Sequence, residues 1–313
     1  MIVMKRSVVA LPLASTLLLT LGGCGSSPDA SGKTGDTVAV TAAFYPLAYA
    51  VERVGGALVT VTTLAKPGAE PHDVELTPKD VAGLRDAGLV VYEKGFQPAV
   101  DSAVDDVDTG RALDVSTAVD LTIQATDDGH EHAGGNDAHE GPDPHFWLDP
   151  TRYASAVTSI STKLAKVDPA NATAYAQNAR TFVAELTELD QEFAAGLKSC
   201  SNRDLVTGHA AFAYLAERYD LHQEGIAGLS PDAEPNAAAM TSVVEHVREH
   251  GVSTVYAETL ANKDLTETIA KETNASVAVL DPIEGLSDAS AGTNYLEVMR
   301  SNLATLRKGQ GCA

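Results

Sequence analysis

Short apolar runs alternate with segments of helical periodicity along residues 37–92. The run Leu58 to Leu64 alternates β-branched residues with others, as strands do. Thr77-Pro78 combines an N-cap threonine with a first-position proline, which predicts a helix start. We expect strands at 37–41, 58–64 and 89–92, and helices at 44–54 and 78–86. Strands that alternate with helices favour a parallel sheet with helices on its faces.

The second half of the chain repeats this alternation after one long helical segment. From Asp168 to Lys198, large apolar residues recur at helical spacing, which predicts a rod about 45 Å long. Beyond it we expect strands at 204–207, 253–257 and 276–280, and helices at 210–219, 236–250, 263–273 and 295–307. The fold class that we predict is α/β, with two similar lobes of parallel sheets joined by one long rigid helix.

The N-terminal residues read as an export signal. Lys5 and Arg6 precede an apolar run from Val8 to Leu21, which is too short and too interrupted to span a bilayer. The run ends in Leu21-Gly-Gly-Cys24, which resembles the lipobox of bacterial lipoproteins, where the peptide is cut before a cysteine that then receives lipid. The alternative is an ordinary signal peptide that contains a cysteine. We expect a signal peptide at 1–23, lipidation at Cys24 and a flexible Gly/Ser/Asp-rich tether up to residue 36.

The cysteine count agrees with this interpretation. The chain has three cysteines, so lipid on Cys24 would leave Cys200 and Cys312 as a pair. A disulfide between them suits an exported protein, and two buried thiols are the alternative. The net charge is −21, and loss of Lys5 and Arg6 with the signal would bring it to −23. Such a surface disfavours nucleic acid and anionic membranes and does not by itself identify a ligand.

Histidines and acids stand where predicted strands end or helices begin, which is the edge of an α/β sheet where ligands bind. The four places are Gly68-Ala-Glu70-Pro-His72-Asp, Asp143-Pro-His145-Phe-Trp-Leu-Asp-Pro150, Gly208-His209-Ala-Ala-Phe and Leu280-Asp281-Pro. Each alone is weak evidence for metal binding. Together, three imidazoles and one carboxylate complete a closed four-coordinate zinc site, whereas manganese prefers more oxygen. The ligands span most of the chain, so we expect the site in the cleft between the lobes, with two ligands from each side.

These segments, together with Ala233-Glu-Pro235, resemble the metal-binding lipoproteins of bacterial ABC importers, in particular the zinc-specific branch. The resemblance covers essentially the whole mature chain. It implies that His72, His145 and His209 are zinc ligands and that Asp281 is the fourth, with Glu70 as its local rival. Manganese members of the family place a glutamate where His209 stands. The resemblance also implies delivery of Zn²⁺ to a permease, and we expect a monomer on the outer face of the cytoplasmic membrane.

Two further histidine patterns call for interpretation. His130, His132 and His139 lie in an acidic, glycine-rich loop at 127–143, which resembles the loop of zinc members and is an auxiliary candidate for weak, rapidly exchanging zinc. The alternative is a solvated linker. His246-x-x-Glu249-His250 fits the inverted zinc-protease signature, but Gly251 ends the predicted helix at once, which favours an ordinary surface helix.

The sequence therefore predicts a zinc-binding protein and not an enzyme, because a site with four protein ligands suits capture better than hydrolysis. The alternatives are a manganese or iron binder of the same fold with an adhesive role, and an extracellular zinc hydrolase. The expected organisation is a signal peptide at 1–23, an anchor and tether at 24–36, a first lobe at 37–167, a linking helix at 168–198 and a second lobe at 199–313.

Overall fold

The structure is a computed structural model that describes residues 37–124 and 141–313. The predicted signal peptide, Cys24 and the tether lie outside the described residues, as does most of the predicted histidine-rich loop. In the two described ranges, no helix has both the length and the apolar character needed to cross a membrane.

The first sheet has four parallel strands in the order β2-β1-β3-β4. Their bounds are β1 Val38–Ala42, β2 Val59–Thr63, β3 Leu89–Tyr92 and β4 Ala112–Asp114. The first three match the predicted strands to within one or two residues, and β4 was not predicted. β3 is the most apolar, with Leu89, Val90 and Val91 fully buried, as expected for a strand inside a covered sheet.

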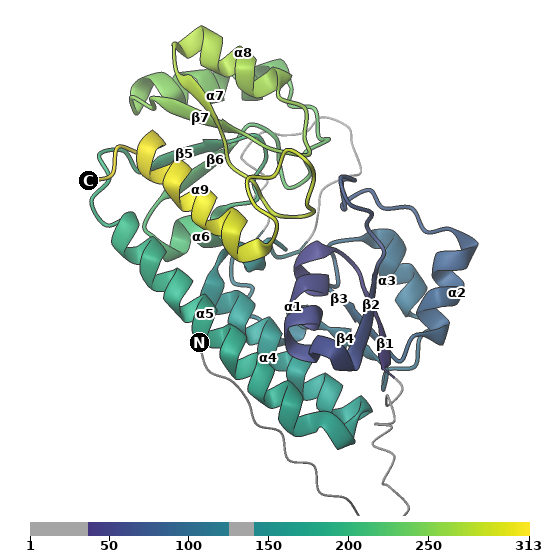
Figure 1. Ribbon diagram of the computed structural model, residues 1–313. Helices are drawn as coiled ribbons and strands as arrows, with labels where there is room; N and C mark the ends of the chain where they lie inside the picture. The colour runs from purple at the N-terminus through teal and green to yellow at the C-terminus, as the bar shows by residue number, and fades with distance from the viewer. Residues whose placement is uncertain (1–36, 125–140) are drawn as a thin grey trace, which may run out of the picture. The chain divides into compact units, whose positions relative to one another are not determined.

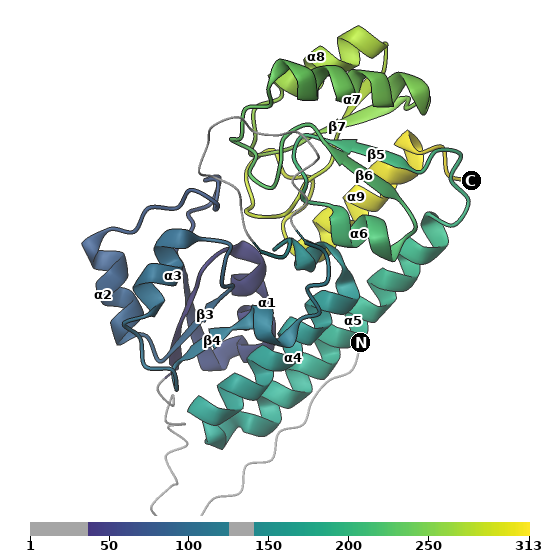
Figure 2. The same cartoon turned by 180° about the vertical axis from the view of Figure 1, so that it is seen from behind.

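Helices cover both faces of this sheet (Figures 1 and 2). The helices α1 Tyr45–Gly55, α2 Pro78–Asp86 and α3 Pro98–Val104 belong to this lobe. Thr77 caps α2 as predicted: its hydroxyl accepts from the Asp80 amide while the Asp80 carboxylate accepts from the Thr77 amide. This reciprocal capping fixes the start of α2 and therefore the end of the loop that contains His72.

The second sheet repeats the topology of the first, with parallel strands in the order β6-β5-β7-β8. Their bounds are β5 Asp204–Thr207, β6 His222–Gly225, β7 Thr254–Ala257 and β8 Ser276–Val279. β6 was not predicted, because His-Gln-Glu-Gly has no apolar alternation. The shared strand order confirms the prediction of two similar α/β lobes.

The helices of the second lobe lie on both sides of its sheet (Figures 1 and 2). They are α6 Ala213–Arg218, α7 Ala237–Glu249, α8 Asp264–Thr273 and α9 Tyr295–Gly309. Asn236 caps the start of α7, where its side chain accepts from the amides of Ala238 and Ala239.

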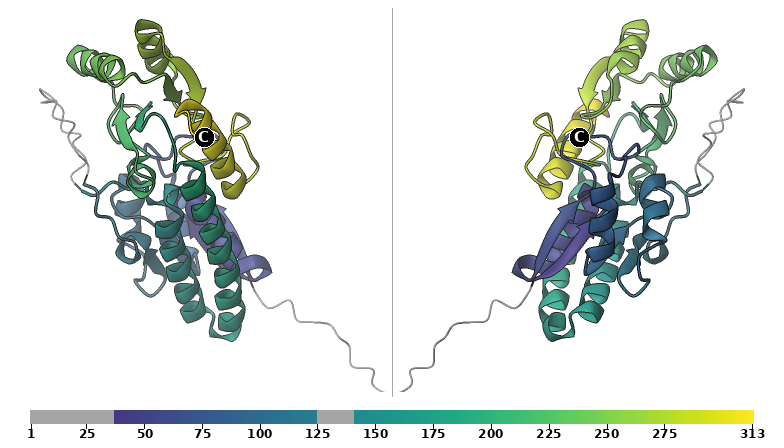
Figure 3. Two further views of the ribbon diagram at one scale, coloured as in Figure 1. Left: turned by 90° about the vertical axis from the view of Figure 1, so that its left-hand side faces the viewer. Right: turned by 90° about the vertical axis from the view of Figure 1, so that its right-hand side faces the viewer.

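The predicted linking helix is present, but it is shorter than predicted and packs against a second helix. The observed helix α5 spans Ala172–Gly196, and Asp168, which we expected to start it, instead follows the preceding helix α4 Pro150–Val167. Asp168 lies in the turn between them, where it accepts hydrogen bonds from Tyr175 and Asn171. Figure 3 shows α4 and α5 side by side. The two lobes are therefore joined by a helical hairpin.

Helix α5 contacts both lobes along its length (Figure 1). Its apolar stripe, which is fully buried, includes Phe182, Leu186 and Phe193 at helical spacing. Glu185 pairs with Arg53 of α1, and Glu192 pairs with Arg300 of α9. Partly exposed pairs of this kind stabilise weakly, so the buried stripe is the main reason why α5 fixes the two lobes on one rod.

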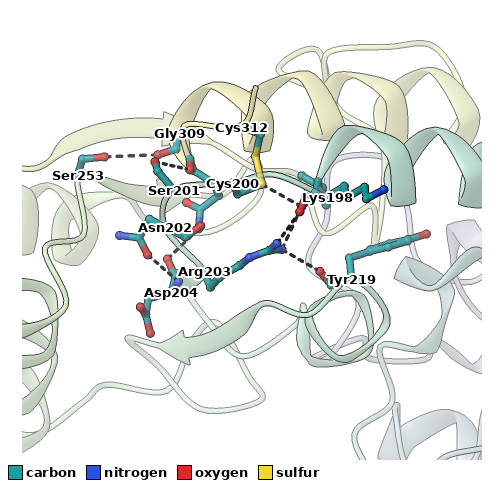
Figure 4. Close-up of a disulfide and its surroundings, with 12 residues drawn as sticks. Lys198, Cys200, Ser201, Asn202, Arg203, Asp204, Tyr219, Ser253, Gly309 and Cys312 are labelled. Carbon is teal, nitrogen blue, oxygen red and sulfur yellow. Dashed lines mark hydrogen bonds between the residues drawn. A yellow bond between two sulfur atoms is a disulfide. The ribbon is translucent and has the colours of Figure 1, made fainter.

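Cys200 and Cys312 form a disulfide, as one of the two sequence interpretations predicted. It joins residues 112 positions apart and ties the C-terminal segment after α9 to the chain between α5 and β5 (Figure 4). Backbone hydrogen bonds from Ser201 and Asn202 to the Gln310 carbonyl reinforce the junction. This corner of the second lobe is therefore held both covalently and by hydrogen bonds.

Candidate metal centre

Four side chains from four different loops converge at the carboxyl ends of the two sheets: His72, His145, His209 and Glu284. His72 follows β2 and His145 comes after β4, while His209 follows β5 and Glu284 comes after β8. All four are buried, with exposed fractions of 6%, 0%, 0% and 1%. The three predicted histidines therefore come together, with two residues of the group from each side, as expected.

Four of the six distances within the group are close to the edge of a zinc tetrahedron. Glu284 Oε1 lies 3.1 Å from Nε2 of both His72 and His145 and 3.2 Å from Nε2 of His209. The Nε2 atoms of His72 and His145 are 3.4 Å apart. A tetrahedron with metal–ligand bonds of about 2.0–2.1 Å has edges of about 3.3 Å. Glu284 Oε2 is buried without a hydrogen-bond partner among the described residues, as suits a carboxylate whose partner is a cation.

Two further carboxylates orient the histidines. Asp143 Oδ1 accepts from the backbone N–H of His145 at 2.8 Å and lies 2.9 Å from its ring Nδ1. Glu258 does the same for His209, with 2.7 Å to the backbone N–H and a short contact to Nδ1. Because a carboxylate accepts, each Nδ1 donates its proton, and Nε2 is the ring nitrogen that faces the centre. A Cβ at Gly208 would come within 2.7 Å of Glu258 Oε1, so glycine leaves the room that Glu258 needs.

The loop before α4 is held by residues of the opposite lobe. Trp147 Nε1 donates to the Pro282 carbonyl at 2.8 Å, and the Tyr295 hydroxyl donates to the Trp147 carbonyl. The Tyr214 hydroxyl donates to the Asp143 carbonyl at 2.9 Å. The positions of His145 and Glu284 therefore depend on each other, since Trp147 links their two loops.

Asp281, which we predicted as the fourth ligand, is not part of the group. Its Oδ1 accepts from the Ile283 amide at 2.8 Å and its Oδ2 accepts from the Ser290 hydroxyl at 2.9 Å. Asn302 of α9 bonds to both the amide and the carbonyl of Asp281. Ile283 has a φ of 58°, a left-handed conformation that β-branched residues rarely adopt. Asp281 thus stabilises a tight turn, and that turn directs Glu284 at the three histidines.

Of the remaining residues predicted to bind metal, the structure describes only Glu70. Glu70 lies beside the centre, with its Oε1 4.0 Å from His72 Nε2 and 3.1 Å from the His72 backbone N–H, which donates to it. Burial, with help from the Glu284 charge, raises the pKa of Glu70 to about 8. It is therefore a neighbour of the four-residue group and not a member of it. His130, His132 and His139 lie outside the described residues.

The charges in the centre offset one another. Burial acts against a charge on His209, but the carboxylates of Glu258 and Glu284 outweigh it and hold its pKa well above the usual value. Burial likewise opposes charge on His145, and Asp143 and Glu284 again raise the pKa. For His72, burial prevails and lowers the pKa. Burial opposes the ionised form of Glu284, but the imidazoles of His209 and His72 hold its pKa well below the usual value.

We expect zinc affinity to rise with pH through neutrality. The raised pKa values of His145 and His209 mean that the metal-free protein holds protons there above pH 6.5, and zinc must displace them. Below those pKa values, affinity should fall by up to about tenfold per pH unit for each proton displaced. Chelator competition between pH 6 and pH 8.5, and calorimetry in two buffers to count released protons, would measure this. A dissociation constant that does not change with pH would contradict it.

Loss of an orienting carboxylate should weaken zinc binding without abolishing it. Glu258→Gln and Asp143→Asn remove the charge that holds each imidazole, and substitutions of this kind typically lower metal affinity about 10–100-fold. Competition titration of purified variants would give the ratio. Glu217→Gln, which changes an exposed carboxylate paired with Arg152, is a suitable control and should leave affinity unchanged. An equal loss in the control would show that overall charge, and not ligand orientation, is responsible.

The fold and the site together define a two-lobed α/β protein in which one buried metal centre is assembled from both sheets. The chain belongs to the family of zinc-uptake complex component A, periplasmic, which it matches over residues 40–309.

Relatives of known identity agree with this assignment. The chain is 34% identical over 301 residues to the high-affinity zinc uptake system protein ZnuA of Bacillus subtilis, covering 94% of each chain. It is also 34% identical to the zinc-binding lipoprotein AdcA of Streptococcus pneumoniae, but it spans only 60% of that longer protein.

Among solved structures, a Zn(II)-bound mutant variant of AdcAII from Streptococcus pneumoniae matches with a TM-score of 0.75 and 29% identity, over 88% of this chain and 99% of that one. The laminin-binding protein Lmb of Streptococcus agalactiae, described as an adhesin with metal-transporting activity, matches with a TM-score of 0.76, 29% identity and the same coverage.

Proposed function

We propose that this protein captures one Zn²⁺ ion outside the cytoplasm and delivers it to the permease of an ABC importer, with His72, His145, His209 and Glu284 as the ligands. The observation that supports the proposal most directly is that four distances within the group are 3.1–3.4 Å, which fits a four-coordinate zinc ion. Three imidazoles and one carboxylate favour zinc over manganese, which prefers more oxygen ligands.

The centre suits binding better than catalysis. A catalytic zinc keeps one position for water or substrate, whereas four protein ligands fill a tetrahedral site. The imidazoles of His145 and His209 are held by orienting carboxylates, so these donor atoms are set before the ion arrives. Burial among the rings of Phe96 and Trp147 also strengthens the attraction between the ion and Glu284. We therefore assign the protein to capture and transport and not to hydrolysis.

Export and anchoring are the second part of the proposal. The sequence before residue 24 has the features of a signal peptide, and Cys24 would take the lipid that holds the mature chain at the outer face of the cytoplasmic membrane. The pairing of Cys200 with Cys312 supports this, because it leaves Cys24 as the remaining cysteine and suits an oxidising compartment. We infer that the protein acts as a monomer and that the 127–143 segment, through His130, His132 and His139, gathers zinc weakly.

Metal analysis of the protein purified from its native membrane fraction tests the zinc assignment. The expected result is one tightly held zinc per chain that excess Mn²⁺ does not displace, and an anomalous-scattering peak among the four proposed ligands. Preferential binding of manganese or iron, or hydrolysis of peptides or esters by the zinc-loaded protein, would contradict the proposal.

Anchoring and delivery need a test in cells. A strain that lacks the protein should grow poorly in chelated medium and recover on addition of zinc or of the wild-type gene. Cys24→Ser should abolish labelling with palmitate and move the protein out of the membrane fraction. Restoration of growth by zinc-binding-deficient His209→Ala would argue against a role in zinc delivery.

A further inference from the structure

A second cluster of metal-ligating side chains lies in the second lobe, away from the centre described above: Asp204, His246 and His250. Asp204 is the first residue of β5, and His209 lies two residues beyond its last residue, Thr207. A strand of four residues is about 13 Å long, so the two sites lie at opposite ends of β5, and they share no ligand. We propose that this cluster binds a second, more weakly held zinc ion.

The two histidines are placed for joint binding by their helix. His246 and His250 are four residues apart at the C-terminal end of α7, so their side chains lie on one face of the helix. Their rings stack at a centroid distance of 4.2 Å with an interplanar angle of 15°. Each ring has a nitrogen within 4.8 Å of the other ring's donor atom, so one cation could bind both imidazoles.

The carboxylate faces both rings without satisfying them. Asp204 Oδ1 lies 3.6 Å from His246 Nε2 and 3.3 Å from His250 Nδ1. Within the described ranges, His246 Nε2 is buried and has no hydrogen-bond partner. An unpartnered buried ring nitrogen is costly in a folded protein. A cation among the three donor atoms, which all lie within 4.8 Å of one another, would satisfy it.

Asp204 is held firmly in its place. Its amide donates to Asn202 Oδ1 at 2.7 Å, and its carbonyl accepts from Gln310 Nε2 at 2.9 Å. Figure 4 shows Asp204 and Asn202 beside the Cys200–Cys312 disulfide, which fixes this corner of the lobe. The side chain of His250 is 47% exposed, against 24% for His246 and 17% for Asp204. The imidazole of His250 can therefore change its orientation, while His246 and Asp204 are held in place.

The chemistry of the cluster suggests the type of ion. Two imidazoles and one carboxylate are donors that zinc accepts, and the oxygen-preferring Mg²⁺ and Ca²⁺ suit them poorly. Three donors leave a fourth position for water, and the cluster is partly exposed. Both features favour weaker binding and faster exchange than at the buried four-donor centre. Neither the signature His246-x-x-Glu249-His250 nor this geometry requires catalysis.

Zinc titration of the protein with its tight site already filled tests the proposal. His130, His132 and His139 are first replaced by serine, so that the 127–143 segment contributes no binding. Zn²⁺ is then added to the one-zinc protein and followed by calorimetry. We expect a second equivalent to bind, and we expect it to be lost in the His246→Ala/His250→Ala variant and in Asp204→Asn. Glu249→Gln, an exposed change of the same charge on the same helix, should retain it.

Uptake of only one zinc by the parent protein, or retention of the second zinc by the double-histidine variant, would overturn the proposal. So would an equal loss in Glu249→Gln, since that result would assign the binding to diffuse surface charge. Retention of the first zinc and an unchanged melting temperature show that each variant is folded. If a variant does not fold, the anomalous signal of a zinc-soaked crystal of the parent decides: a peak between Asp204 and the two rings is expected, and its absence refutes the site.

Discussion

Glu284→Gln should lower the affinity of the protein for Zn²⁺ by roughly 100-fold or more, because removal of a ligand charge should exceed the 10–100-fold loss typical of orienting residues. Glu284 Oε1 faces all three imidazoles at 3.1–3.2 Å. A glutamine keeps the shape of the side chain but removes the charge that draws a dication into a buried site. Competition with a chelator of known affinity, at constant pH, would measure the change.

Asp281→Asn is the matched comparison, because it changes the same charge three residues earlier. Asp281 accepts hydrogen bonds within its own turn and does not face the histidines. An asparagine oxygen can still accept from the Ile283 amide, so we expect a loss well below that of Glu284→Gln. A larger loss in Asp281→Asn than in Glu284→Gln would show that Asp281 is the ligand after all.

Removal of the Cys200–Cys312 disulfide should destabilise the protein strongly while leaving the zinc centre intact. Cross-linking residues 112 positions apart restricts the unfolded chain, and loss of such a bond typically costs about 2–5 kcal/mol. The melting temperature should fall by roughly 5–15 °C. The Cys200→Ser/Cys312→Ser variant, measured by calorimetry in a Cys24→Ser background, tests this.

A reducing agent offers an internal control for the same prediction. It should lower the melting temperature of the parent and have no effect on the double-serine variant. Zinc affinity should be unchanged in both, because the disulfide lies at the opposite end of β5 from His209. An unchanged melting temperature on loss of the bond would contradict the stabilising role.

Most elements could be predicted because their local signals agree with their tertiary setting. Thr77-Pro78 predicted the start of α2, and the structure has the full capping box. Asp149-Pro150 carries the same N-cap and proline signal before α4, with the Asp149 side chain accepting from the Thr151 amide. The sequence analysis uses those residues only as one of the four candidate metal-binding places, so it does not predict α4. The signal was present in the sequence, and the helical hairpin follows from it.

The three histidines could be predicted because each lies between a strand and the helix that follows it, where the loops of a parallel sheet meet at one edge. The same rule could not identify Glu284, since Asp281 and Glu284 both follow β8, and Glu284 reaches the centre through a turn with a left-handed Ile283. A β-branched residue gives no sequence signal for that conformation. Asp281 lies only two residues after β8, so the strand-end rule favours it over Glu284 as the fourth ligand.

The orienting carboxylates show a second limit of what local sequence patterns can predict. Asp143 is two residues from His145 and could have been noticed as a local partner. Glu258 follows β7, while His209 follows β5, and their contact depends on the pairing of those two strands. Strand order is a tertiary property that local periodicity does not contain. The same is true of the contact between Asp204 and the two histidines of α7.

The near-complete burial of the four ligands has a kinetic consequence. None of them is more than 6% exposed, and they come from four loops of two sheets. A chelator in solution therefore cannot attack the bound ion until the loops separate, and this local opening limits departure. The rate at which a chelator strips zinc should then level off as its concentration rises, at a value that reports the opening rate itself. An importer that speeds up this opening would determine when the ion is released, without needing a stronger zinc site of its own.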